Sequence, residues 1–146
     1  MTVVIEPISA NDHAAVLSLL ENAELPTAGA SEHISSFLVA RDGDKIVGCI
    51  GLEAYGDVAL LRSLAATKDV RGSGVGRRLV EGLIVRARSD GVSVLYLLTT
   101  TADEYFPRFG FERITRGEID ERVQASEELR GACPDTAICM RLGLSI

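Results

Sequence analysis

The chain has 146 residues, with 15 Lys and Arg against 21 Asp and Glu, so its formal net charge is −6. This length and a composition of 47% hydrophobic and 25% charged residues indicate a folded globular protein, and we expect residues 1–146 to form a single domain. The acidic balance argues against a nucleic-acid-binding protein, and no apolar stretch is long enough for a membrane helix. The opening residues lack the features of a signal peptide, and three cysteines do not suggest a secreted disulfide framework. We therefore expect a cytoplasmic protein.

The first half of the chain predicts one helix and then an antiparallel meander of strands. Ser9 and Asp12 form a capping-box pattern ahead of apolar residues at helical spacing. An Asp-Gly turn at residues 42–43 lies between two short apolar runs, which is a hairpin signal. The expected elements are a helix from residue 9, a loop or loose second helix over 24–32, and strands over 37–40, 46–52 and 58–66.

The second half predicts a crossover unit followed by shorter elements. Apolar residues from Val75 to Ala87 recur at helical spacing, and Gly91 follows where a helix C-terminus favours a left-handed residue. The nearly continuous apolar run 92–99 predicts a strand buried on both faces, parallel to the strand over 58–66. The remaining expected elements are a short helix over 102–108, a strand over 111–114, a polar helical stretch over 120–130 and a strand over 136–142.

A basic, glycine-bearing segment stands out in this acidic chain. Residues 62–88 carry a charge of +5, which leaves −11 for the rest. Within it, Arg71-Gly72-Ser73-Gly74-Val75-Gly76-Arg77 lies between the third strand and the amphipathic helix. Glycines allow close backbone approach, and a helix start offers unpaired N–H groups, so the loop suits a pyrophosphate. It fits neither the dinucleotide-binding nor the triphosphatase pattern. The alternatives are a plain turn and a solvated basic helix face.

The order of these features resembles the GNAT acyl-CoA-dependent N-acetyltransferases. The residues that carry the resemblance are Leu61-Arg62-Ser63-Leu64-Ala65-Ala66, then Arg-x-x-Gly-x-Gly, a long helix and a buried strand, and later Tyr105-Phe106-Pro107-Arg108-Phe109-Gly110-Phe111. The resemblance covers nearly the whole chain. It implies an α/β fold with a mixed, mostly antiparallel central sheet, a splayed parallel strand pair and flanking helices. It also implies acetyl-CoA as co-substrate, a small-molecule amine as acceptor, no metal, and a homodimer as in many relatives.

The resemblance further implies which residues bind the coenzyme. Backbone amides of the glycine loop would hold the pyrophosphate, and the splayed strand edge would hydrogen-bond the pantetheine arm. The implied coenzyme-binding residues are Leu64, Ala65, Ala66, Arg71, Gly72, Ser73, Gly74, Val75, Gly76, Arg77 and Phe106.

A finer resemblance concerns the acceptor. The run from Tyr96 to Ala102, Glu53 with its neighbours, and Cys133-Pro134 with Cys139-Met140 look like the arsenic-resistance N-acetyltransferases. The Leu-Thr-Thr-Thr-Ala run is also similar to the acetyltransferase domain of N-acetylglutamate synthases. Both imply acetylation of an amino-acid α-amine, as in arsinothricin, phosphinothricin or glutamate. The alternatives are another small amine or peptide, and a non-catalytic acyl-CoA-binding sensor.

The acceptor amine must lose a proton, and the leaving thiolate must gain one. Glu53 is the first candidate for the base, and its alternative is an exposed glutamate at a strand end. The family's usual tyrosine, four residues before the glycine of Gly-Phe, falls at Phe106, so that position cannot supply the second proton. A water or another residue must do so. The family's asparagine falls at Thr99.

Arginine and threonine side chains are the candidates for binding a glutamate-like acceptor. Arg62 precedes the cofactor strand and has the fork that pairs with carboxylate or phosphinate; otherwise it is a surface base. The Thr99–Thr101 hydroxyls contact the acceptor or the coenzyme arm, unless they form a strand end with an N-cap at Thr101. His33 lines the acceptor entrance or is a solvated loop residue. For Cys133 and Cys139 we expect packing roles, with arsenic binding or a covalent acetyl intermediate as alternatives.

Overall fold

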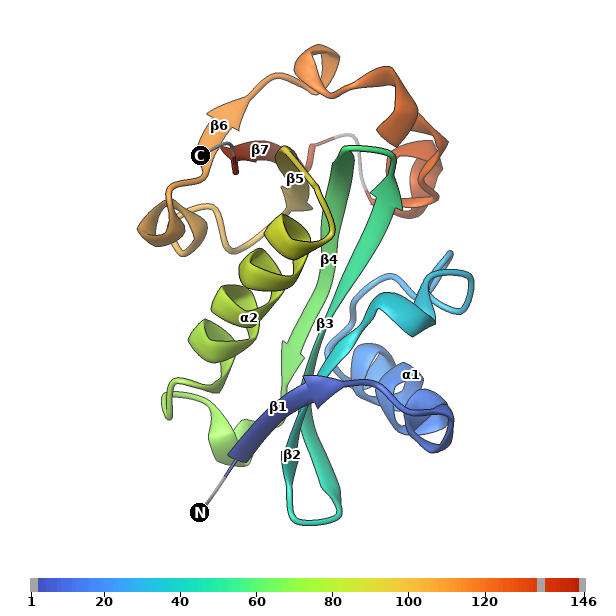
Figure 1. Ribbon diagram of the computed structural model, residues 1–146, viewed down its shortest axis with the longest axis vertical. Helices are drawn as coiled ribbons and strands as arrows, with labels where there is room; N and C mark the ends of the chain where they lie inside the picture. Colours follow the sequence, from blue (N-terminus) through green and yellow to red (C-terminus); the bar gives the residue numbers. More distant parts are fainter. Residues whose placement is uncertain (1–2, 134–135, 145–146) are drawn as a thin grey trace.

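The computed structural model describes residues 3–133 and 136–144, and these build one mixed sheet with helices on both faces (Figure 1). Among these residues the sheet has seven strands in the order β1-β2-β3-β4-β5-β7-β6. The strands are β1 (Val3–Pro7), β2 (Leu38–Asp42), β3 (Lys45–Tyr55), β4 (Val58–Ala66), β5 (Val94–Thr99), β6 (Glu112–Ile114) and β7 (Ile138–Gly143). Only the β4–β5 pair is parallel in this part of the chain, so the predicted mixed, mostly antiparallel sheet is confirmed.

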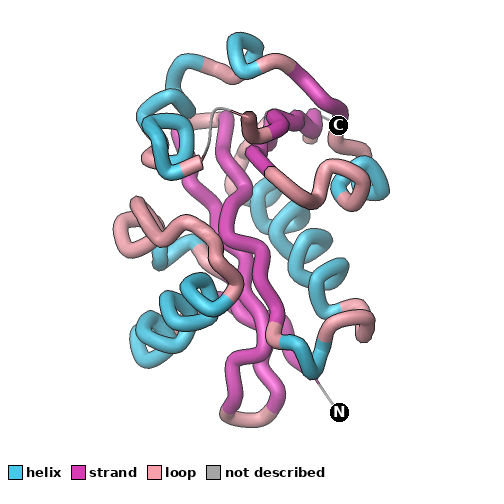
Figure 2. Tube along the Cα trace, turned by 180° about the vertical axis from the view of Figure 1, so that it is seen from behind, coloured by secondary structure: helices cyan, strands magenta, loops and turns pink. Residues whose placement is uncertain are grey.

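Two helices cover opposite faces of the sheet (Figures 1 and 2). Helix α2 (Val75–Ser89) buries Leu79 and Leu83 against Leu38 and Ala40 of β2. Helix α1 (His13–Asn22) packs on the other face, where alternate residues of the same strands point. No helix within the described residues is long and apolar enough to cross a membrane.

The predicted meander and crossover are present, with one strand that the sequence analysis missed. Strand β1 pairs antiparallel with β2 along the outer edge of the sheet. Three of its five residues are β-branched, and their burial alternates only weakly. Pairing with β2, more than its own sequence pattern, therefore makes this segment a strand. Strand β5 is buried on both faces as expected, with Leu95 and Leu97 toward α2 and Tyr96 on the opposite face.

The helix predicted over 75–87 is present as α2, but the segments 102–108 and 120–130 contain only short helical turns. Instead of a helix over 102–108 there is a single 3₁₀ turn, η4 (Phe106–Phe109), with Pro107 near its start. The stretch 120–130 contains a 3₁₀ turn, η6 (Glu121–Ala125), and a separate turn, η7 (Glu128–Ala132). The extended backbone of Ser126 separates them, and Gly131 has φ 127°, so no continuous helix can form. Residues 24–32 form a loop with turns, which is one of the two expected arrangements.

A bulge between β3 and β4 changes which way the end of β4 faces. The pairing passes from Cys49↔Ala65 to Gly51↔Arg62, so two residues of β4 stand against one of β3. Ser63, one of those two residues, has φ 63°. Parallel pairing of β4 with β5 ends at Leu60↔Tyr96, although both strands continue beyond those residues. The two strands therefore separate toward the C-terminal end of β4.

The close packing of Gly51 against Phe37 allows the packing of this sheet to be tested directly. A Cβ at this position would lie 2.4 Å from Phe37 Cε1, and Phe37 is completely buried. We predict that Gly51→Ala lowers the free energy of unfolding by about 1–3 kcal/mol, because the overpacked ring must move. Gly117→Ala is the matched control, since nothing lies within 4 Å of its Cβ. Denaturant unfolding of the two variants checks this, and equal stabilities would contradict the packing described here.

Candidate active site

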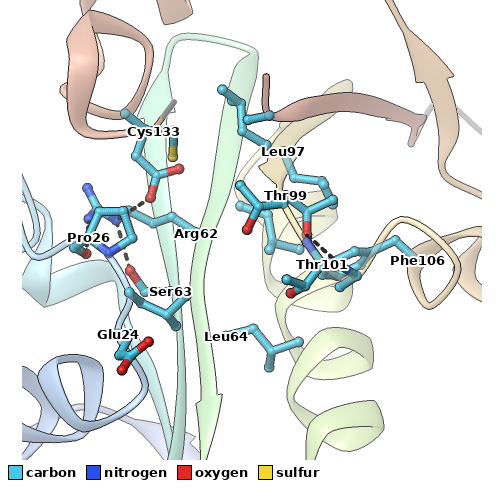
Figure 3. A pocket seen from close by; sticks show the side chains of 17 residues that line it. Glu24, Pro26, Arg62, Ser63, Leu64, Leu97, Thr99, Thr101, Phe106 and Cys133 are labelled. Atoms are coloured by element: carbon cyan, nitrogen blue, oxygen red, sulfur yellow. Dashed lines mark hydrogen bonds and ion pairs between the residues drawn. The ribbon is translucent and has the colours of Figure 1, made fainter. Parts of the chain in front are cut away.

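A cavity lies where β4 and β5 separate (Figure 3). Its volume is about 540 Å³. Residues 61–64 of β4 form one wall, and residues 97–102 form the other. The lining is completed by the loop residues 24–26 and by Phe106, Glu128, Cys133 and Ala137. In the described chain the residues other than glycine with positive φ are Glu24 and Ser63, and both line this cavity. Backbone strain of this kind is concentrated at functional sites.

The separated strands leave backbone groups available to an extended ligand. Beyond Leu60 and Tyr96 the facing edges of β4 and β5 are not paired with one another. Such edges are completed by a chain that carries amide groups, which lies between them as an additional strand.

The glycine loop leads into the N-terminus of α2. Gly72 has φ 84° and Gly74 has φ 90°, and a Cβ at either position would meet nothing within 4 Å. These glycines are therefore required by the backbone conformation and not by packing in the free protein. The first amides of α2 have no intrahelical acceptor and point out of the helix end, which favours an anion. A second hollow of about 210 Å³ beside the loop is lined by Arg77, Glu81, Tyr105, Arg108 and Phe109.

Arg62 is buried, and four of its five N–H groups have protein acceptors. Its side chain is 0% exposed, so it is not the surface base that the sequence left open. Its Nε donates to Ser63 Oγ at 2.9 Å, and Nη1 donates to Glu53 Oε2 at 2.6 Å. The carbonyls of Ala28 and Pro26 accept from Nη1 and Nη2 at 2.9 and 3.0 Å. Protein acceptors thus take most of the donors that this fork would use to hold an acidic acceptor, and its predicted role in binding the acceptor stays a prediction.

Glu53 and His33 lie behind the cavity wall. Glu53 is 1% exposed and is not among the cavity-lining residues, so it is neither an exposed strand-end glutamate nor a residue of the cleft. The Tyr55 hydroxyl donates to it at 2.5 Å, and burial raises the pKa of Tyr55, which keeps that proton in place. His33 Nε2 lies 3.7 Å from Glu53 Oε1 and also lies outside the cavity lining. Its predicted position at the acceptor entrance is not observed.

Phe106 and the threonines lie on the β5 side of the cavity. Phe106 is buried edge-to-face against Phe111, so the cavity has an apolar ring where the family places a tyrosine. Tyr105, its neighbour, faces the second hollow near Gly76. Thr99 Oγ1 accepts from the amides of Ala102 at 2.9 Å and Thr101 at 3.4 Å, so Thr99 closes a local turn, and the predicted N-cap at Thr101 is wrong because the next helical turn starts only at Phe106. Thr100 and Thr101 are exposed, and both line the cavity at its rim.

Glu128 is a second buried carboxylate, which the sequence did not reveal, and it lines the cavity. Its side chain is 5% exposed, and Oε2 lies 3.5 Å from Arg62 Nε. Burial raises the pKa of Glu128 to about 7, opposed by Arg62 and reinforced by Glu53. No spacing or motif marks this residue, because it belongs to a broken turn that the sequence presents as a solvated helix.

The cysteines are free and buried in this structure. Burial raises the pKa of Cys133 to about 12, which disfavours the thiolate that a nucleophile would need. Cys139 is on β7, and Cys133 lines the cavity. Pro134 lies outside the described residues.

Comparison with known proteins agrees with this arrangement. The chain matches the acetyltransferase (GNAT) domain over residues 33–113, which is more than half of its length. The chain belongs to the GNAT acetyltransferase family. The match begins before β2 and ends in β6, so it includes the glycine loop and both separated strands.

Relatives of this GNAT domain include much longer proteins. An amino-acid acetyltransferase of Neisseria meningitidis is 31% identical over 91 residues, which cover 61% of this chain and 21% of that protein. An uncharacterised N-acetyltransferase of Chlorobaculum tepidum is 31% identical over 93 residues, covering 63% of this chain and 59% of that protein. The chain thus aligns with only about a fifth of the Neisseria relative's length.

Solved structures show the same fold over the whole chain. N-acetylglutamate synthase from Neisseria gonorrhoeae, complexed with coenzyme A and N-acetyl-glutamate, has a TM-score of 0.84 and 23% identity, covering 100% of this chain and 36% of that one. The protein Rv2747 from Mycobacterium tuberculosis, in complex with CoA and NLQ, has a TM-score of 0.79 and 22% identity, covering 97% and 99% of the two chains.

The buried Arg62 gives a stability prediction for this site. We expect Arg62→Met to lower the free energy of unfolding by about 3–5 kcal/mol, because two buried carboxylates lose their cation. Arg77→Met, on the exposed side of α2, is the matched control and should change stability by less than about 0.5 kcal/mol. Chemical denaturation measures both, and a mild effect of Arg62→Met would contradict its role as the centre of this cluster.

Proposed function

We propose that this GNAT domain transfers the acetyl group of acetyl-CoA to the α-amine of a small, glutamate-like amino acid. The observation that supports this proposal most directly is the cavity of about 540 Å³ between the separated strands β4 and β5. The glycine loop follows β4 along the chain, and the buried charged cluster of Arg62 and Glu128 lines the cavity. This arrangement offers one place for a long, amide-bearing thioester and another for a small amine.

The residues present fit acetyl-CoA, which supplies the activated acetyl group. The amides of residues 72–77 would hold its pyrophosphate, with Arg71 and Arg77 adding positive charge. The backbone of Leu64, Ala65 and Ala66 would pair with the pantetheine amides, since the facing edge of β5 is not bonded to it. Phe106 would pack against the arm of the coenzyme.

The acceptor end is built for a small polar molecule. Thr100 and Thr101 offer hydroxyls at the rim, and Arg62 fixes the loop carbonyls of Pro26 and Ala28 that lie beside the cavity. The similarity to amino-acid acetyltransferases and to N-acetylglutamate synthase supports an amino-acid acceptor. Within that class we propose arsinothricin or phosphinothricin, with glutamate itself as the natural-amino-acid alternative.

Phe106 favours a second candidate function. An apolar ring stands where family members often have the tyrosine hydroxyl that protonates coenzyme A, which suits a protein that binds acyl-CoA without turning it over.

The cytoplasmic location and the homodimer stay predictions.

The glycine loop gives a prediction for coenzyme binding. Gly74→Ala forces a Cβ into a left-handed backbone, so the loop shifts away from the conformation that holds a pyrophosphate. We expect about tenfold weaker acetyl-CoA binding, which corresponds to about 1.4 kcal/mol. Gly43→Ala is the matched control, because Gly43 has φ 61° and equal free space but lies in the β2–β3 turn. Calorimetric titration separates the two, and equal weakening would exclude a direct role of the loop.

The acceptor is tested by measuring coenzyme A release with arsinothricin, phosphinothricin, methionine sulfoximine and glutamate as separate substrates. We expect turnover with the phosphinate or arsenic compound and little with glutamate. Turnover with glutamate alone would replace the detoxifying function by an amino-acid-metabolising one. Acetyl-CoA binding without release in any of the four would overturn the amino-acid acceptor and favour the binding protein.

A further inference from the structure

Glu128 is the buried carboxylate of the cavity lining. The other carboxylate of that lining, Glu24, is exposed at the loop side. Glu53, the base that the sequence suggested, lies behind the wall and holds Arg62 at 2.6 Å. A base must reach the amine that it deprotonates, and among the described buried carboxylates of this cluster only Glu128 borders the cavity.

The carboxylate of Glu128 lies farther from the Arg62 guanidinium than the carboxylate of Glu53 does. Oε2 of Glu128 is 3.5 Å from Arg62 Nε, and that nitrogen donates its proton to Ser63 Oγ at 2.9 Å. The Cys133 thiol also lines the cavity and lies near the Glu128 carboxylate (Figure 3 shows Cys133 above Arg62). Glu128 therefore has acceptor capacity left on the side of the cavity.

The buried charges do not balance. Arg62 is one cation between two buried carboxylates, Glu53 and Glu128, so the cluster carries a surplus negative charge when both are ionised. The groups that face Glu128 or its immediate partners are Arg62 from β4, Glu53 and Tyr55 from β3, Cys133 after η7, and at greater distance His33 and Arg116. Burial of the surplus charge is unfavourable unless a proton or a cation joins it. An amino-acid acceptor arrives with such a cation, its ammonium group.

We propose that Glu128 receives the ammonium group of the acceptor and removes its proton, so that Glu128 and not Glu53 is the catalytic base. This inference rests on the proposed function. Glu128 takes one proton from the ammonium and becomes a neutral acid. The freed amine forms the new C–N bond to the acetyl carbon, the C–S bond breaks, and the remaining surplus proton on nitrogen goes to the thiolate to give free coenzyme A. Glu128 then returns its proton to water.

The test compares Glu128→Gln with Glu127→Gln, an exposed neighbour on the same segment. For the wild type, kcat/KM should rise with pH through a limb near pH 7, where Glu128 loses its proton. Glu128→Gln should lower kcat/KM about 100-fold at neutral pH and abolish that limb. The deficit should shrink at high pH, where more of the acceptor enters as neutral amine. Affinity for acetyl-CoA should stay within twofold, and Glu127→Gln should behave as wild type.

Folding provides a second readout that needs no turnover. The fold favours protonated Glu128, so this stabilising contribution is complete below the ordinary pKa of 4.5 and is lost as the pH rises through about 7. Glu128→Gln leaves the Arg62–Glu53 pair intact and should remove this pH dependence without unfolding the protein. Urea unfolding at pH 5 and pH 8 measures it, and an unchanged dependence would overturn the placement of the surplus charge on Glu128.

The outcomes separate this inference from the proposed function. If the wild type acetylates an amino acid and Glu128→Gln keeps both rate and pH limb, the assignment of Glu128 is wrong and the function stands. A limb that disappears in Glu53→Gln instead would return the role to Glu53. If only other amines react, the proposed acceptor is wrong, and the Glu128 comparison is made with those amines. If none reacts although acetyl-CoA binds, both proposals are overturned.

Discussion

Strands β4 and β5 are parallel neighbours over three residue pairs, and the candidate site depends on their separation beyond Leu60 and Tyr96. A continuous ladder would leave neither a cavity nor free backbone edges. The bulge at Ser63 turns the end of β4, so that Leu61 and Leu64 face α2 while Arg62 and Ala65 face the other side. The bulge thus lies where the strands separate, and the guanidinium of Arg62 lies beside the opening.

Burial of that guanidinium organises the irregular part of the structure. A buried Arg needs acceptors for its N–H groups, and residues 26–28, which have no regular secondary structure, supply two carbonyls. Gly29 follows at the same place, where a Cβ would lie 3.2 Å from Arg62 Nη1. The loop that forms one side of the cavity is therefore held by hydrogen bonds to a side chain from the central sheet, together with the apolar packing of Leu25 and Ala30.

The sequence alone predicts those elements whose structure is decided by local residue patterns. The β2–β3 hairpin, helix α2, the buried strand β5 and its parallel direction all follow from spacing and turn chemistry. The failures are contacts between distant residues. Glu53 has the sequence surroundings of a strand-end glutamate, and only the folded chain brings Arg62, Tyr55 and His33 around it. Glu128 is separated from Arg62 by 66 positions, and no periodicity connects a broken turn to a bulged strand.

The phenylalanine at position 106 and the buried carboxylate of Glu128 fit one another chemically. Acetyl transfer to an ammonium removes two protons from nitrogen, and the leaving thiolate takes up one of them. With Phe106 in place of a tyrosine, the β5 wall offers threonine hydroxyls and an apolar ring but no acidic side chain. The proton that the thiolate needs is already on the attacking nitrogen. A single carboxylate that accepts the first proton is then sufficient, and the surplus negative charge beside Arg62 supplies it. The absence of the tyrosine and the presence of Glu128 therefore fit the same transfer, in which the protein accepts one proton and the reactants exchange the other.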